Sequence, residues 1–121
     1  MRFVPTLIHG AIDYAWGLAL LVAPFLFGFA AGGAAQWTAM IAGAGAVLYA
    51  LATDYELGLL PLLSMRTHLL VDAAGGALIA ASPWLLGFAD RTFAVHVAFG
   101  LFSVAASLVT RLEPRRTAWA S

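Results

Sequence analysis

Two histidine–aspartate pairs are the residues of this chain whose types and spacing could do chemistry. His9 precedes Asp13 by four residues, and His68 precedes Asp72 by the same interval, 59 positions further along. A spacing of four places both side chains on one face of a helix. A carboxylate beside an imidazole favours the imidazolium, so each pair could hold a proton. Imidazole nitrogens and carboxylate oxygens also bind divalent metal ions, and two histidines can hold a haem iron.

The two pairs belong to a longer duplication of the chain. Small, proline and aromatic residues recur at the same interval of 59 positions: Gly17, Pro24, Gly28, Phe29 and Ala30 return as Gly76, Pro83, Gly87, Phe88 and Ala89. At about 100° per residue, the shared positions 9 to 28 lie on one face of a helix. Polar and small residues on one face of a membrane helix point at other helices. We therefore expect His9, Asp13, His68 and Asp72 to form a polar intramembrane cluster.

The composition places these helices in a membrane. Hydrophobic residues make up 63% of the 121 residues, charged residues only 10%, and the mean hydropathy is +0.93. A soluble domain of this size could not bury so much apolar surface. Four apolar stretches, at about 5–30, 36–53, 66–89 and 92–111, are long enough to cross the hydrocarbon layer. The sequence predicts an all-α bundle of four transmembrane helices, made of two tandem helical hairpins related by a parallel pseudo-two-fold axis along the membrane normal.

One membrane domain accounts for the whole chain in this interpretation. Repeat one covers about 5–53 and repeat two about 64–111, with an interfacial loop at 54–63 and a surface tail at 112–121. The loop opens with Asp54, Tyr55 and Glu56, and we expect it to lie against the membrane surface, with a partner or metal contact through its carboxylates as the alternative. Five of the six arginines fall on one side of the predicted bundle, which places both termini in the cytoplasm.

Several function classes are disfavoured by what the chain does not contain. It has no lysine and a formal net charge of zero, so a nucleic-acid partner is not expected. The absence of cysteine excludes disulfides, thiolate nucleophiles and covalently attached c-type haem. No nucleophile elbow, phosphate loop or metalloprotease motif is present in the sequence. We therefore expect no enzymatic activity.

The tripeptide Ser82, Pro83 and Trp84, with the Leu-Leu-Gly-Phe-Ala-Asp stretch that follows it, resembles the SPW repeat family of small bacterial integral membrane proteins. The resemblance implies a two-repeat, four-helix protein of the bacterial inner membrane and carries no established activity. The first half of the chain has Ala-Pro-Phe in place of the tripeptide. Physically, Pro83 frees the carbonyl of Ile79, to which Ser82 can donate, and Trp84 suits the aromatic belt at the membrane surface.

Three functions remain open on the sequence alone. We favour a structural or accessory membrane protein that assembles with itself or joins a larger membrane complex, with the repeated His/Asp stripe fixing helix packing. The first alternative is a divalent metal or haem site at His9 and His68 with Asp13 and Asp72; no other cofactor is predicted. The second is proton or ion movement through the two aspartates. His96, which aligns with Trp37, lies toward the opposite side, and no row of polar residues links it to the cluster.

Overall fold

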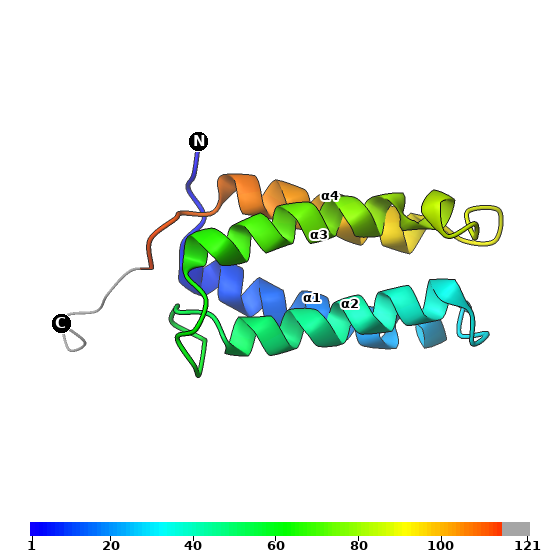
Figure 1. Cartoon of the computed structure of the whole chain (residues 1–121), viewed down its shortest axis with the longest axis horizontal. Coiled ribbons are helices and arrows are strands. Elements are labelled where there is room, and N and C mark those ends of the chain that lie inside the picture. The colour runs from blue at the N-terminus through cyan, green and yellow to red at the C-terminus, as the bar shows by residue number, and fades with distance from the viewer. Residues whose placement is uncertain (115–121) are drawn as a thin grey trace.

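A computed structural model describes residues 1–114 of the chain. It contains four helices, α1 (Thr6–Leu26), α2 (Ala34–Leu51), α3 (Met65–Leu85) and α4 (Ala94–Val109), which confirms the predicted all-α architecture. Figure 1 shows α1 and α2 as one hairpin lying beside the hairpin of α3 and α4. Residues 1–5, the 52–64 loop and residues 110–114 lie at one end, here called the proximal end. The two hairpin turns lie at the opposite, distal end.

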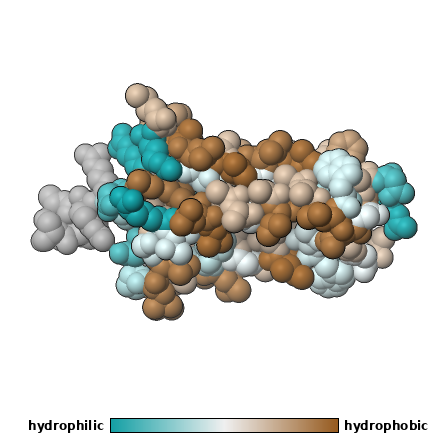
Figure 2. Space-filling model, turned by 45° about the horizontal axis from the view of Figure 1, so that its top comes forward, coloured by the Kyte–Doolittle hydropathy of each residue, from teal (hydrophilic) through white to brown (hydrophobic). Residues whose placement is uncertain are grey.

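The helices have the length and surface of membrane spans. α1, α2 and α3 are each long and apolar enough to cross a membrane, while α4 is apolar but has only 16 residues. Large apolar side chains such as Ile41, Leu48 and Leu70 are exposed along the helices. Figure 2 shows hydrophobic flanks, with hydrophilic residues gathered toward the two ends. An apolar surface of this extent is characteristic of a protein surrounded by lipid, so the chain is a membrane protein.

Glycines bring the two helices of each hairpin into close contact. A Cβ atom placed on Gly17 would lie 2.8 Å from the carbonyl oxygen of Gly43, so α1 and α2 touch through their backbones. In the other repeat, a Cβ on Gly76 would lie 2.6 Å from the carbonyl oxygen of Gly100. Small residues allow membrane helices to approach in this way. Each repeat is therefore a tightly packed pair of helices.

The first helix of each repeat ends earlier than the sequence predicts. α1 stops at Leu26 and α3 at Leu85, four residues before the predicted limits of 30 and 89. The cause is Gly28 and its repeat counterpart Gly87, which adopt positive φ values of 77° and 75°. The next residue in each turn donates its N–H back to the carbonyl of the helix proline, at 2.9 and 2.8 Å, as in a Schellman C-cap. The apolar run continues through the turn, so hydropathy alone places the helix end too late.

The second helix of each repeat also differs slightly from its predicted limits. α2 begins and ends two residues earlier than 36–53, and α4 is two residues shorter at each end than 92–111.

At the start of α3 the side chain of Ser64 accepts a hydrogen bond from the backbone N–H of Thr67, 3.1 Å away, as expected of an N-cap. This cap fixes where α3 leaves the loop and therefore the height of His68 and Asp72 in the bundle.

Candidate metal centre

Four buried side chains predicted to form a polar cluster meet between α1 and α3, in the proximal half of the bundle. His9 Nε2 lies 3.1 Å from Asp13 Oδ1 and 2.8 Å from Asp72 Oδ2. His68 Nε2 lies 2.9 Å from Asp13 Oδ2 and 3.3 Å from Asp72 Oδ2. Each histidine therefore faces both carboxylates, its own and that of the other repeat. We call these four residues the quartet.

Two threonines determine which nitrogen of each histidine faces the carboxylates. His9 Nδ1 is 2.7 Å from Thr110 Oγ1, and His68 Nδ1 is 2.7 Å from Thr53 Oγ1. Each threonine hydroxyl also donates to the backbone carbonyl four residues earlier in the chain, at 2.6 Å. A hydroxyl has one proton, so once that proton is donated the oxygen can only accept, and Nδ1 must carry hydrogen. The Nε2 atoms of both histidines are thus directed at the aspartates.

Two tyrosines donate hydrogen bonds to the carboxylates. Tyr49 of α2 donates to Asp72 Oδ1, and Tyr55 of the loop donates to Asp13 Oδ2 at 2.8 Å. Burial, together with the negative charge of Asp13, raises the pKa of the Tyr55 phenol above its usual value. The phenol therefore stays protonated and remains a donor. Tyr49 binds the Asp72 oxygen that does not face the histidines, whereas Tyr55 shares Asp13 Oδ2 with His68.

A small cavity lies beside the quartet. Its volume is about 10 Å³, and its walls include His9, Asp72, Tyr49 and Ser103. A space of this volume holds about one water molecule or ion. His68 Nε2 is fully buried, yet no hydrogen bond of acceptable geometry reaches it within the described structure. The nitrogen nevertheless faces the Asp13 carboxylate, whose Oδ2 lies 2.9 Å away, an arrangement that suits either an ion pair or a metal ion held by both side chains.

Comparison with known families identifies the repeat. A family model described as the SPW repeat domain matches residues 7–110, which include both His/Asp pairs and both proline–glycine helix ends. The chain belongs to the SPW repeat domain family. SPW repeat proteins are not a known enzyme family. Among curated proteins and among solved structures, nothing was found that matches this chain.

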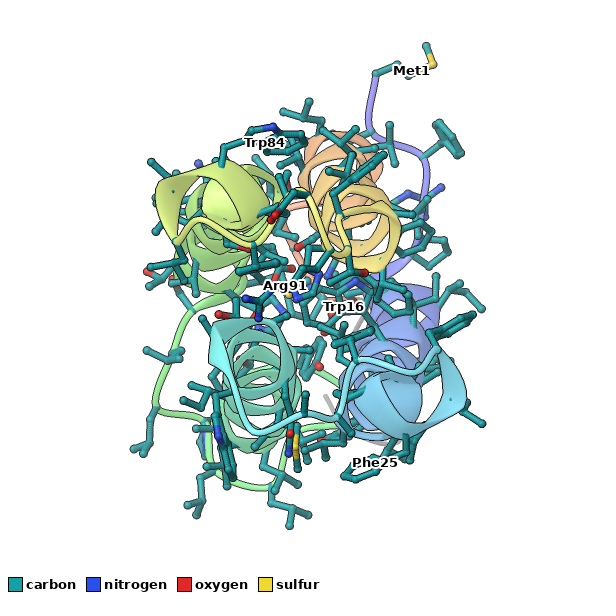
Figure 3. The ribbon with its side chains drawn as sticks, turned by 90° about the vertical axis from the view of Figure 1, so that its right-hand side faces the viewer. Met1, Trp16, Phe25, Trp84 and Arg91 are labelled. Atoms are coloured by element: carbon teal, nitrogen blue, oxygen red, sulfur yellow. The ribbon has the colours of Figure 1, made fainter. Side chains whose placement is uncertain are left out.

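The SPW signature itself lies at the distal end and builds a helix terminus. Ser82 Oγ donates a hydrogen bond of 2.6 Å to the carbonyl of Ile79. Pro83 cannot donate to this carbonyl because proline has no N–H. Trp84 is 61% exposed and points away from the bundle, whereas Trp16 points toward its interior (Figure 3). The remaining signature positions, Pro24, Gly28 and Gly87, belong to the two helix ends described above. None of them contacts the quartet in the described structure.

The loop motif of this SPW protein is divided between the bundle interior and its surface. Tyr55 is buried against the quartet, and Glu56 accepts a hydrogen bond of 2.6 Å from Thr6 of α1. The backbone N–H of Asp54 donates to Leu63 at 2.7 Å, which closes the base of the loop. The leucines between them, Leu59, Leu60 and Leu62, are exposed. Of the three motif residues, only Tyr55 contacts the quartet, while the apolar residues of the loop face outward.

Sequence reasoning named Tyr55 only as part of the loop and did not identify Tyr49, Thr53 or Thr110 as partners of the quartet. The threonines follow the second helix of each repeat, but they are 57 positions apart instead of 59, so the repeat alignment does not pair them. A signal does exist, since each threonine comes directly after the apolar stretch that ends its repeat. The structure pairs each with a residue two positions before the other repeat's first helix, Thr110 with Val4 and Thr53 with Leu63.

His96 is separate from the quartet. It is fully buried near the distal end, between the rings of Phe29 and Phe88, with ring centroids 5.2 and 4.8 Å from its own. Its Nε2 donates to the backbone carbonyl of Ala35 at 2.9 Å. The two phenylalanines are repeat counterparts, so His96 lies at a junction between the repeats. Its contacts indicate a packing role.

Proposed function

We propose that this SPW repeat protein binds one divalent first-row metal ion of the zinc type between its two repeats. His9 and His68 would supply Nε2, and Asp13 and Asp72 one carboxylate oxygen each. The observation that carries the proposal is that four such donor atoms lie within 4.8 Å of one another. With Oδ2 of each aspartate as the ligand atom, three nitrogen–oxygen separations are 2.8, 2.9 and 3.3 Å, close to the edge of roughly 3.3 Å expected for a tetrahedron with ligands about 2.0–2.1 Å from zinc.

Charge and hydrogen bonding support the same proposal. Two carboxylates and two neutral imidazoles around a divalent cation give a site of zero net charge, which a membrane interior favours. Thr53 and Thr110 would act as the outer hydrogen-bond partners that fix the orientation of metal-ligating histidines. Tyr49 bonds Oδ1 of Asp72 and leaves Oδ2 for the ion.

The site favours an ion over a haem, and a structural role over a catalytic one. A cavity of about 10 Å³ has no room for a macrocycle unless α1 and α3 separate. Four protein ligands also complete a tetrahedral coordination sphere, whereas catalytic zinc sites keep an open position. We therefore infer a structural or accessory protein without enzymatic activity, in which the ion joins the repeats. Its assembly with itself or with a larger complex stays a prediction.

Proton movement is less well supported. Leu20, Ala23 and Ala39 form a buried apolar cluster against which Trp16 and Phe99 pack. This cluster lies along α1 on the distal side of Asp13. A path from the quartet to His96 would have to cross it without polar side chains, which does not favour a proton relay.

The arginine distribution supports an orientation. Arg2, Arg66 and Arg111 lie at the proximal end and Arg91 at the distal turn. By the positive-inside rule we propose that the proximal end, with both termini, faces the cytoplasm of a bacterial inner membrane. Arg115 and Arg116, together with the rest of the predicted tail after residue 114, lie outside the described residues.

The test is a metal titration of the purified full chain in detergent after chelator treatment. We expect one Co²⁺ or Zn²⁺ per chain, with the visible absorption of tetrahedral Co²⁺. Asp72→Asn and His68→Gln should each weaken binding on the order of 100-fold or more, since each removes a ligand. Asp90→Asn and His96→Gln make the same changes outside the quartet and should bind as the wild type does. A wild type that binds neither ion, or controls that fall equally, would refute the proposal and leave the quartet as an ion-paired link between helices.

A further inference from the structure

A second candidate site is a groove at the proximal end between α3 and α4. Its volume is about 360 Å³. Two arginines and a row of apolar side chains form most of its walls: Arg2, Arg66, Leu69, Leu70, Ala73 and Leu108. Two cations above an apolar trough are an unusual combination for a surface that only has to contact lipid tails.

The two guanidinium groups are held at the groove in different ways. Arg2 Nη1 donates to the backbone carbonyls of Ser107 and Thr110, at 2.6 and 2.8 Å, and so binds the carbonyl-rich end of α4. A guanidinium also carries N–H groups on Nε and Nη2, which can donate to an anion. Arg66 is 66% exposed on the side chain, and Glu113 Oε1 lies 3.8 Å from its Nη2. An exposed pair at this distance contributes little, so Arg66 can exchange it for a stronger anion.

The depth of these residues matches a phospholipid. Arg66 stands in the first turn of α3 and Arg2 precedes α1, so both lie at the end of the spans where headgroups are expected. Leu69, Leu70 and Ala73 follow further along α3, toward the hydrocarbon layer. The gathering of hydrophilic residues at this end, beside hydrophobic flanks, is visible in Figure 2. A phosphate at the arginines would thus place an acyl chain along the leucines.

We propose that this groove binds one anionic phospholipid. The phosphate accepts charge-assisted hydrogen bonds from Arg2 and Arg66, and one acyl chain fills the trough along α3 and α4. Two arginines face one glutamate here, so the groove carries an excess positive charge that favours an anionic over a zwitterionic headgroup. The site is independent of the metal proposal, because it uses no residue of the quartet.

Native mass spectrometry of the full chain in detergent tests this, with phosphatidylglycerol and phosphatidylcholine of identical acyl chains as probes. We expect one retained phosphatidylglycerol per chain, bound at least tenfold more tightly than phosphatidylcholine. Arg66→Gln should weaken phosphatidylglycerol binding about fivefold, which corresponds to one arginine near a charged surface. Arg91→Gln removes the same charge at the distal end and should change nothing. We leave Arg2 unsubstituted because it also binds the end of α4, so its loss would disturb the helix as well as the groove.

A second variant separates a defined site from general attraction to anionic headgroups. Ala73→Trp fills the trough and leaves both arginines in place, so it should abolish retention of the single lipid. Equal retention of the two lipids would overturn the proposal. So would equal losses in Arg66→Gln and Arg91→Gln, or unchanged retention in Ala73→Trp.

Discussion

At the scale of single residues, Thr53 and Thr110 determine how the two histidines of the quartet are oriented. Neither would be a ligand, yet each accepts the Nδ1 proton of one histidine and directs Nε2 at the aspartates. The hydroxyl oxygen is left to accept from Nδ1–H because the hydroxyl donates its own hydrogen bond to a backbone carbonyl. Orientation of this kind is what the outer hydrogen-bond partners of metal sites supply.

Thr110→Val therefore tests positioning without touching a ligand. Valine keeps the shape of threonine but cannot accept the proton of His9, so the imidazole loses its fixed tautomer and orientation. We expect the affinity for Co²⁺ to fall about 10- to 100-fold. Thr110→Ser, which restores the hydroxyl, should recover most of it. Wild-type affinity in Thr110→Val would show that the threonine does not orient the histidine.

Tyr49→Phe probes the outer side of the carboxylates. Removing the hydroxyl leaves Asp72 Oδ1 buried without its donor, and a lost hydrogen bond to a charged group costs about 1.5–3 kcal/mol. We expect the free energy of unfolding in a mixed-micelle denaturation to drop by that amount. Tyr14→Phe is the matched control, because the Tyr14 hydroxyl donates to Leu57 at an exposed position. If both variants lost the same free energy of unfolding, the hydrogen bond to Asp72 would contribute no more to stability than an exposed one.

At the scale of helices, the end of each repeat's first helix depends on one glycine. Gly87 has a φ of +75°, in the left-handed region that a residue with a Cβ adopts at a cost of about 1–2 kcal/mol. We expect Gly87→Ala to lower the free energy of unfolding by that amount. Gly75, inside α3 and with open space around its Cβ position, is the control, and Gly75→Ala should leave stability equal or higher. A Gly87→Ala variant as stable as Gly75→Ala would contradict this account of the helix end.

The same scale explains what the sequence could and could not predict. Apolar length and the duplication were enough to predict four helices in two hairpins, because both are properties of the chain read locally. The predicted ends of α1 and α3 lie four residues too late because apolar residues continue past each helix end, as Leu85 and Phe88 do around Gly87. The quartet's shared face was readable from the four-residue spacing. Its partners were not, since Tyr55 and Thr53 reach the quartet only through the folding of the 52–64 loop.

At the scale of the whole molecule, the quartet lies where the two repeats meet. Glycine contacts bring α1 against α2 and α3 against α4, but the quartet connects α1 with α3 across the hairpins. The bonds from Thr53 and Thr110 also cross between repeats. A ligand held by all four side chains would therefore stabilise the arrangement of one hairpin on the other more than either hairpin alone.

This predicts a metal-dependent stability of the whole bundle. A ligand that binds only the folded state stabilises it by about 2.7 kcal/mol at a concentration 100 times its Kd. We expect thermal unfolding of the wild type in detergent to shift upward with Zn²⁺ at that excess and back again with a chelator. The double variant Asp13→Asn/Asp72→Asn should show no such shift, whereas Asp90→Asn should show all of it. An unfolding temperature of the wild type that is indifferent to Zn²⁺ and chelator would mean that the hairpins are joined by the side chains of the quartet alone.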